Sequence, residues 1–334
     1  MAVQEPPLLA LVGPTAVGKT AVGIALAQKW NGEIISADAV AVYRGLDIGS
    51  AKPDAAERQR AVFHLIDVAA PDEDFTVADF ARLAEDAIAD IRSRNRVPIL
   101  VGGTGLYVRS VTATLSMPEV PPQPELREAL WAEVQEHGAP FLHERLRQRD
   151  PVSAQKILPG DAKRIIRALE VYSVTGQPLS AFHTPEGVQG VPRPNTVIWG
   201  LGMERERLYA RIEARMDAMV AEGFVAEVER LLAAGYGPEL KAMQSLGYRH
   251  IAAFLRGDLD WETAIFELKR DTRRYAKRQI SWFRADPRVQ WLNLDRLEHP
   301  QEKGIETAAD SASVAPRAET AADAIITALE SAER

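Results

Sequence analysis

The sequence predicts an α/β protein, in which a parallel sheet carries flanking helices and the chain leaves the sheet once for an all-helical insertion. Three observations predict this. Short apolar runs alternate with amphipathic stretches before residue 117, a proline-rich break follows, and an apolar run near residue 196 resumes the alternation. A chain of 334 residues is long enough for about two domains.

Each element is predicted from the spacing of its apolar residues. Apolar runs that end at a turn residue predict strands, and apolar residues three or four apart predict helices. Before the break, we expect strands at 8–12, 33–36 and 97–101 and helices at 20–30 and 75–93. In the insertion, we expect helices at 124–136, 139–149 and 163–174. After it, we expect a strand at 196–201 and helices at 204–221, 227–234 and 261–284.

The end of the chain differs in composition from the rest. From residue 299 onward, seven acidic and three basic residues stand among many alanines, which predicts a solvated tail with a short helix at 320–329. We therefore expect four segments: a first part of the α/β core at 1–116, the helical insertion at 117–195, a second part of the core at 196–298, and the acidic tail at 299–334.

The overall composition excludes several classes of protein. Lysine and arginine number 40 against 47 aspartates and glutamates, so a uniformly basic coat for nucleic acid is excluded, although a local basic groove is not. The chain has no cysteine, which excludes disulfides, thiolate metal sites and cysteine nucleophiles. No apolar run approaches the roughly 18 residues of a membrane helix, and residues 1–7 carry no positive charge. We therefore expect a cytoplasmic protein that does not bind membranes. We also expect it to be a monomer.

A phosphate-binding loop follows the first strand. The pattern G-x-x-x-x-G-K-[ST] is met between a strand and a helix, as it is in P-loop proteins, so the expected sheet is P-loop NTPase-like. Its main-chain N–H groups and the helix N-terminus favour an anion, its lysine reaches the terminal phosphate, and its last hydroxyl can ligate Mg²⁺. The loop consists of Gly13, Pro14, Thr15, Ala16, Val17, Gly18, Lys19 and Thr20.

The loop predicts a bound di- or triphosphate but does not identify the molecule that carries it. A kinase or NTPase would also place a carboxylate for Mg²⁺ after an apolar strand, and residues 63–67, which end in Asp67, match that pattern only weakly. A small-molecule kinase or NTPase therefore stays open as a second function. A nucleotide-regulated RNA-binding protein without chemistry is a third.

Two polar residues follow the second and third predicted strands. Asp38 comes after the strand at 33–36, and Thr104 follows the strand at 97–101. The carboxyl ends of parallel strands form one edge, where ligands of α/β proteins bind, so both residues should share a cleft with the phosphate loop. The carboxylate could hold Mg²⁺ or act as a general base. A helix N-cap for Asp38 and a turn hydroxyl for Thr104 are the structural alternatives.

A basic stretch near the C-terminus stands out in this acidic chain. Residues 268–284 contain seven lysines and arginines but only one acidic residue, Asp271, and Tyr275, Trp282 and Phe283 are interleaved with them. Cations with stacking surfaces between them are typical of RNA contacts, whereas a solvated charged helix is the alternative. A weaker basic patch lies at 163–167, and the glycine-centred loop at 245–249 allows a close approach to a flipped base.

Together these segments resemble one family, the bacterial tRNA dimethylallyltransferases. The resemblance runs from about residue 8 to 295 and has one clear departure, since Ala39 stands where family members usually carry serine. It is carried by GPTAVGKT at 13–20, IISADAVAVYRGLDIGSAKP at 34–53, HLIDV at 64–68, FTVADF at 75–80, PILVGGTGLY at 98–107, RIIRALEVY at 164–172, LGYR at 246–249 and AKRQISWFR at 276–284.

The resemblance implies a transfer reaction. The family moves a dimethylallyl group from dimethylallyl diphosphate to N6 of adenine 37, beside the tRNA anticodon. The P-loop would then hold the donor's diphosphate with Mg²⁺ at Thr20, Asp38 would act as general base, and Thr104 would orient the base or the leaving oxygen. Arg215 would be a further clamp on the diphosphate, or else part of a structural ion pair. A related enzyme acting on free AMP is less well supported, because it would need neither the insertion nor the basic helix.

The resemblance also implies which residues contact the anticodon stem-loop of the tRNA. They are Asp38, Ala39, Val40, Ala41, Thr104, Arg127, Lys163, Arg164, Ile165, Ile166, Arg167, Gln244, Ser245, Leu246, Gly247, Tyr248, Arg249, Arg274, Lys277, Arg278 and Gln279.

Overall fold

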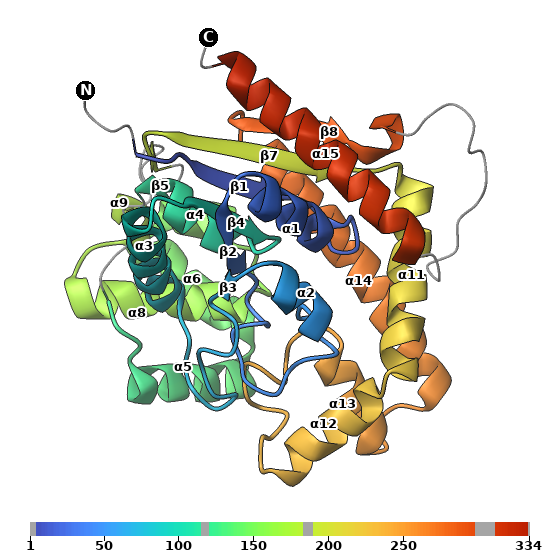
Figure 1. Ribbon diagram of the computed structural model, residues 1–334. Helices are drawn as coiled ribbons and strands as arrows, with labels where there is room; N and C mark the ends of the chain where they lie inside the picture. Colours follow the sequence, from blue (N-terminus) through green and yellow to red (C-terminus); the bar gives the residue numbers. More distant parts are fainter. Residues whose placement is uncertain (1–4, 115–119, 183–189, 298–310, 333–334) are drawn as a thin grey trace. The chain divides into compact units, whose positions relative to one another are not determined.

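The computed structural model describes residues 5–114, 120–182, 190–297 and 311–332 (Figure 1). It divides into two compact units. We call the described residues of 1–112 and 194–334 the sheet unit and those of 113–193 the helical unit. The expected boundaries at residues 117 and 299 lie outside the described residues. No helix in the described ranges is both long and apolar enough to cross a bilayer.

The sheet unit is built on six parallel strands, which confirms the predicted α/β class. Two edge strands, β3 and β8, were not among the expected elements, because each is short or partly exposed. The strands in spatial order are β3 (Phe63–His64), β2 (Gly32–Ala37), β4 (Val97–Gly102), β1 (Leu8–Val12), β7 (Thr196–Gly202) and β8 (Val289–Asn293).

The register brings three strand ends to one level. Gly102 at the end of β4 pairs with Val12 of β1 on one side and with Ala37 of β2 on the other. The next residues along these strands are therefore neighbours at the carboxyl edge of the sheet. They are Gly13 of the phosphate loop, Asp38 and Gly103.

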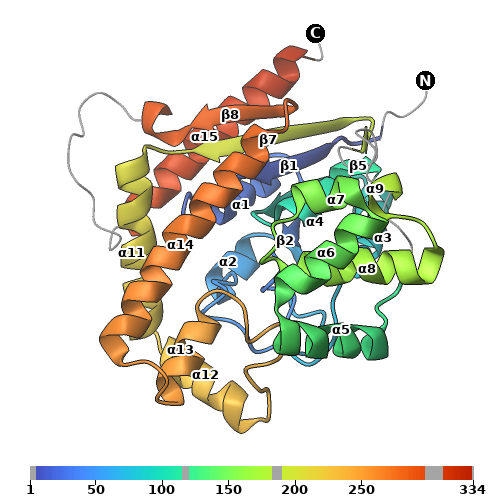
Figure 2. The same cartoon turned by 180° about the vertical axis from the view of Figure 1, so that it is seen from behind.

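Helices cover both faces of the sheet. Leu9 and Leu11 of β1 pack with α1 (Lys19–Lys29) and α15 (Ser311–Ala332), whereas Leu8 and Ala10 pack in the core that contains α3 (Val77–Ser93), α4 (Gly105–Thr112) and part of α14 (Trp261–Arg284). Figure 1 shows α1 and α15 in front of the sheet, and Figure 2 shows α4 and α14 on its other face. The alternation of inward and outward residues along a strand explains both contacts.

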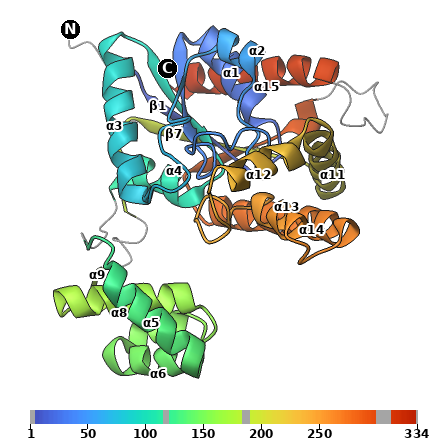
Figure 3. The same ribbon diagram turned by 90° about the horizontal axis from the view of Figure 1, so that it is seen from below.

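The remaining helices of the sheet unit lie beside α1 or beyond one end of the strands (Figure 3). The expected helix at 227–234 begins at Phe224, directly after Gly223, whose φ of 103° starts the helix from a left-handed turn. Two short helices were not predicted, since their apolar periods are incomplete. The helices are α2 (Ala55–Arg60), α11 (Arg205–Ala221), α12 (Phe224–Ala233) and α13 (Tyr248–Leu255), with a 3₁₀ turn η1 (Leu294–Leu297).

The expectation of a solvated tail is wrong for α15. Its inward residues Ala322, Ile325 and Leu329 are buried in the core beside α1. Lys29 of α1 also forms ion pairs with Glu319 at 3.0 Å and Asp323 at 2.6 Å. Small alanines allow the two helices to approach closely, and of the acidic residues that suggested a tail, Asp323 and Glu330 are exposed on α15.

The helical unit contains the expected helices and two short additional ones. The carboxylate of Glu170 is buried in this unit. It accepts hydrogen bonds from Arg127 Nε at 2.7 Å and Arg167 Nη1 at 2.5 Å. A two-stranded antiparallel ladder joins the two chain ends of the unit, β5 (Ala113–Thr114) and β6 (Val191–Pro192). The helices are α5 (Pro124–His137), α6 (Ala139–Arg149), α7 (Pro151–Lys156), α8 (Ala162–Thr175) and α9 (Leu179–Phe182).

Candidate active site

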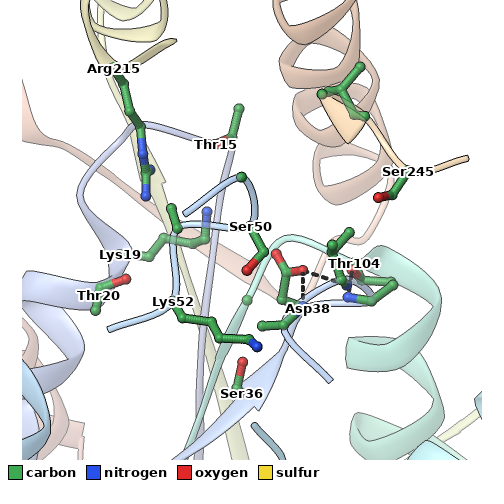
Figure 4. Close-up of a pocket in the computed structure, with 18 of the residues that line it drawn as sticks. Thr15, Lys19, Thr20, Ser36, Asp38, Ser50, Lys52, Thr104, Arg215 and Ser245 are labelled. Carbon is green, nitrogen blue, oxygen red and sulfur yellow. Dashed lines mark hydrogen bonds between the residues drawn. The ribbon is translucent and has the colours of Figure 1, made fainter. Parts of the chain in front are cut away.

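A cavity of about 330 Å³ opens at the carboxyl edge of the sheet (Figure 4). Its polar side is formed by the phosphate loop and the ends of β2 and β4. Its apolar lining includes Ile34, Val101, Met216, Met219, Phe224 and Leu268. A charged ligand group and an apolar ligand group can therefore both be accommodated in this cavity.

The phosphate loop has the strand–loop–helix context that the sequence predicts. Three of its residues adopt positive φ, Gly13 at 148°, Ala16 at 64° and Gly18 at 107°, and α1 starts directly after Gly18. Gly13 is required by space as well as by its φ of 148°, because a Cβ there would lie 2.7 Å from the carbonyl oxygen of Leu201. The tight turn thus depends on glycine at both ends of the loop.

Lys19 folds back over its own loop. Its Nζ donates to the carbonyl oxygens of Gly13 at 3.0 Å and Pro14 at 2.8 Å. Burial lowers the pKa of Lys19 to about 8; the positive charge of Arg215 adds to this and the carboxylate of Asp38 opposes it. Most of the Lys19 ammonium is therefore charged at neutral pH.

Asp38 and Thr104 both line the cavity, and neither has the structural role that was its alternative to catalysis. Turn residues and no helix follow Asp38, and the hydroxyl of Thr104 contacts the loop after β2 and not its own turn. Asp38 Oδ1 accepts from the amides of Val40 at 2.8 Å and Ala41 at 3.2 Å. Thr104 Oγ1 accepts from the amide of Ala39 at 3.0 Å. Within the part of the chain that the structure describes, Asp38 Oδ2 accepts no hydrogen bond, so one carboxylate oxygen is held in place while the other is available to a ligand.

Arg215 enters the same cavity from α11 (Figure 4). No carboxylate of the described residues lies within ion-pair distance of it, so the structural ion pair considered from the sequence is not found. Partial burial lowers the pKa of its guanidinium. One turn earlier on α11, Arg211 Nε donates to the carbonyl oxygen of Ala16 at 3.0 Å and so braces the phosphate loop.

Lys52 is a cavity residue that the sequence reasoning missed. Its side chain is only 3% exposed, and its Nζ donates to Asp47 at 2.6 Å, Asp67 at 2.5 Å and the carbonyl oxygen of Tyr43 at 2.7 Å. Asp67, the weak candidate for an NTPase carboxylate, is thus neutralised by Lys52 and does not line the cavity. Among the described residues, no group of three or more His, Asp or Glu side chains is arranged to hold a metal ion.

Glu227 is a second residue that the sequence did not single out. It is buried on α12, and its carboxylate accepts from the amides of Asp47, Ile48 and Gly49 at 2.8–3.1 Å. Tyr248 donates its hydroxyl to the same carboxylate at 2.6 Å. Four donors on one buried glutamate join the loop after β2 to the start of α13, and no local pattern in the sequence reveals such a long-range contact.

Several residues that we expected to contact RNA are buried in the protein or paired with other side chains. The side chains of Ile165 and Ile166 are buried in the helical unit, and that of Tyr248 is buried beside Glu227, so we assign all three to the protein interior instead of to RNA. Arg127 and Arg167 are committed to the buried Glu170. The cavity lining does include Ala39, Val40, Ala41, Ser245, Leu246 and Gly247, and the exposed residues include Lys163, Arg164, Gln244 and Arg249.

The basic helix α14 is more extensively paired than its sequence indicates. Lys269 contacts Asp217 at 2.6 Å and Arg273 contacts Glu213 at 2.5 Å, so α11 supplies acidic partners that a local reading of residues 268–284 cannot see. Arg274 has a longer contact of 3.5 Å with Asp271. In the described ranges, the exposed side chains of Lys277 and Arg278 have no carboxylate within ion-pair distance.

The fold and the cavity define a P-loop α/β protein in which a phosphate-binding loop, a carboxylate and an apolar compartment share one site. The model of the IPP transferase family matches residues 41–286. The chain belongs to this family, whose members include the tRNA dimethylallyltransferases, a class of prenyltransferase enzymes.

Individual relatives agree with this assignment. The chain is 52% identical to the tRNA dimethylallyltransferase of Desulforudis audaxviator over 295 residues, which is 88% of this chain and 94% of the relative. A crystal structure of the full-length tRNA isopentenylpyrophosphate transferase of Bacillus halodurans is 39% identical, covers 98% of both chains and has a TM-score of 0.66. A eukaryotic dimethylallyltransferase acting on tRNA is 27% identical, with a TM-score of 0.71 over 86% of this chain and 74% of that one.

Proposed function

We propose that this protein transfers the dimethylallyl group of dimethylallyl diphosphate to N6 of adenine 37 in the tRNA anticodon loop. The observation that carries the proposal is one cavity with two chemical sides, a phosphate loop with Lys19 and Arg215 on one and apolar side chains on the other. A prenyl diphosphate needs both, whereas a nucleoside triphosphate would meet an apolar wall in place of polar groups for its sugar.

The donor's diphosphate binds at the phosphate loop in this proposal. Loop amides, the N-terminus of α1 and the two partly buried cations Lys19 and Arg215 supply positive potential for it. The five-carbon chain lies against the apolar wall that includes Met219 and Leu268. Burying an apolar group of this size also excludes water, which would otherwise compete with the acceptor for the donor.

Mg²⁺ is part of this proposal, and the residues present fit it. Thr20 and Asp38 both line the cavity, and Mg²⁺ in phosphate sites uses one or two protein oxygens together with phosphate oxygens and water. We propose that the Thr20 hydroxyl ligates it. When bound, the ion neutralises negative charge on the diphosphate and makes it a better leaving group.

Asp38 is the general base of the proposed reaction. The N6 atom of adenine forms a bond to C1 of the dimethylallyl group while the bond from C1 to the diphosphate oxygen breaks. The nitrogen becomes positive as its bond forms, and it must lose a proton, which passes to Asp38 Oδ2. The amides of Val40 and Ala41 hold the other carboxylate oxygen, so Asp38 keeps one orientation throughout.

The adenine reaches this cavity only if it leaves the stacked anticodon loop. We propose that Thr104, residues 39–41 and the loop at 245–247, all of which line the cavity, receive the flipped base. Lys277 and Arg278 of α14 then bind neighbouring phosphates, and Lys163 and Arg164 of the helical unit provide a second basic surface. The protein acts as a monomer in this proposal.

One incubation tests the proposed function against its alternatives. The protein is mixed with Mg²⁺, dimethylallyl diphosphate and unmodified tRNA, and the digested RNA is analysed by mass spectrometry. We expect dimethylallyl-adenosine at position 37 and release of diphosphate. ATP hydrolysis or phosphoryl transfer without prenylation would instead support a kinase or NTPase, tRNA binding without turnover would support an RNA-binding protein, and modification of free AMP would remove the need for tRNA.

A further inference from the structure

We infer that Gln279 is a positioning residue that couples RNA binding on α14 to donor binding at the phosphate loop. The inference rests on the proposed function, because it takes the phosphate loop as the donor site and α14 as an RNA-binding helix. It changes the role of Gln279 from an RNA contact to a bridge between the two substrates.

Both ends of the Gln279 amide are occupied by main-chain groups. Its Oε1 accepts from the amide of Thr15 in the phosphate loop at 2.8 Å, and its Nε2 donates to the carbonyl oxygen of Gly103 at 3.0 Å. The side chain is 6% exposed, so it is not available to RNA. A single side chain of α14 thus holds the turn after β1 and the turn after β4 at a fixed separation.

The surroundings of Gln279 make this bridge specific. A Cβ at Gly103 would lie 2.1 Å from Gln279 Nε2, so the close contact requires glycine at that position. An apolar residue in place of Gln279 would leave a buried amide and a buried carbonyl without partners, which is more costly than losing two exposed hydrogen bonds. The bridge is therefore sensitive to the exact position of α14 along the sheet edge.

The same turn of α14 bears the groups that face the RNA. Lys277 and Arg278 are exposed immediately before Gln279, and Tyr275 lines the cavity one turn earlier. The Arg278 guanidinium lies 5.7 Å from the centre of the Tyr275 ring. Burial raises the pKa of Tyr275 to about 12, so its hydroxyl stays protonated beside the cavity. A regular helix connects these residues, so fixing its exposed side also fixes Gln279.

The coupling arises because RNA binding and diphosphate binding both restrict the motion of α14. RNA that holds α14 through Lys277 and Arg278 restricts Gln279, and Gln279 restricts the Thr15 amide at the start of the phosphate loop. A diphosphate that then binds the loop has less conformational entropy to remove. Thermodynamic linkage makes the effect reciprocal, so a bound diphosphate tightens RNA binding by the same factor.

Inorganic diphosphate is the probe for this coupling, because it occupies the donor site without allowing turnover. Its Kd is measured by calorimetry with Mg²⁺, for the protein alone and for the protein saturated with an unmodified anticodon stem-loop RNA. We expect the RNA to lower the Kd by about fivefold or more, in the usual range of coupling between two sites. Gln279→Leu removes both hydrogen bonds at similar side-chain size. In this variant, the ratio of the diphosphate Kd without RNA to the diphosphate Kd with RNA should approach one.

Lys269→Gln is the matched control on the same helix. Lys269 is paired with Asp217 of α11 and is not part of the path from the RNA to Gln279, so this variant should retain the wild-type ratio. Amide hydrogen exchange in the unmodified protein adds a readout that does not depend on a variant folding. RNA alone should slow exchange in the peptide that contains Thr15.

Two results overturn the coupling while leaving the proposed function intact: a ratio of one in the wild-type protein that binds both probes, or an unchanged ratio in a folded Gln279→Leu. Unaltered exchange at Thr15 upon RNA binding would do the same. Failure of the wild-type protein to bind either diphosphate or RNA would instead contradict the proposed function itself.

Discussion

Among single residues, Lys19 links donor binding to pH in the proposed reaction. Its pKa of about 8 in the ligand-free protein is low because the ammonium is buried beside Arg215. Protonated Lys19 binds the diphosphate and neutral Lys19 does not, so donor affinity is highest below pH 8 and falls as the pH rises through that value. We expect binding to be roughly tenfold weaker at pH 9 than at pH 7, measured as the Kd of dimethylallyl diphosphate.

Lys19→Met is the control for this titration. It should bind the donor weakly at both pH values, since it lacks the ammonium, and any change that remains reports the titration of the diphosphate itself. An equal pH dependence in the variant and in the wild-type protein would remove Lys19 from the donor site.

Some residues of the candidate site can be predicted from the sequence and others cannot. The phosphate loop and the residues after β2 and β4 are local features, because a motif or a strand end places each of them. Lys52, Glu227 and the bridge at Gln279 depend on contacts between segments far apart in the chain, for which a single sequence carries no periodic signal. The burial of Ile165 and Ile166 could have been predicted, since their spacing on α8 matches the core face of that helix.

At the scale of elements, we expect the docking of α15 on the core to stabilise the fold, although its acidic composition suggests a solvated tail. Ile325 is fully buried against the core beside α1. We expect Ile325→Ala to lower the free energy of unfolding by about 2–4 kcal/mol, because it leaves a cavity in a packed interior. Urea unfolding followed by circular dichroism measures the loss.

Thr327→Ala on the exposed side of α15 is the matched control and should change stability by less than about 0.5 kcal/mol. Equal effects of the two substitutions would mean that α15 does not dock on α1. The spacing of Ala318, Ala322, Ile325 and Leu329 already indicated an inward face, but the acidic composition of the segment favoured a solvated tail.

The basic helix α14 provides a second test at this scale. Neutralising Lys277 and Arg278 together as glutamines should weaken tRNA binding and reduce the slope of log affinity against log salt by about 0.7–0.9 per lost phosphate contact. Filter binding or fluorescence anisotropy at several salt concentrations measures the slope.

Lys269→Gln with Arg273→Gln removes the same charge from the same helix. These two cations are already paired with Asp217 and Glu213 of α11, so their loss should leave the salt slope near the wild-type value. If the paired residues changed the slope as much as Lys277 and Arg278, the phosphate contacts would have to be placed along the whole of α14.

At the scale of the whole molecule, the predicted class and most elements are confirmed because they follow from apolar periodicity. The parallel sheet could be predicted from buried strands that alternate with helices, and its register then places Gly13, Asp38 and Gly103 side by side. The short edge strand β3 and the brief helices α7 and α9 were not predictable, since two to six residues are too few to show a period.

In the proposed reaction, one cavity holds the donor's diphosphate at Lys19 and the acceptor nitrogen at Asp38. Single-turnover kinetics of Asp38→Asn with dimethylallyl diphosphate and unmodified tRNA test it most directly, because the variant keeps the shape of the side chain and loses the base. We predict that the rate constant for prenyl transfer falls by about 10²–10⁴, while the Kd values of donor and tRNA stay near wild type. A near-normal rate constant in Asp38→Asn would contradict this account and would require another group, such as the departing diphosphate, to take the proton.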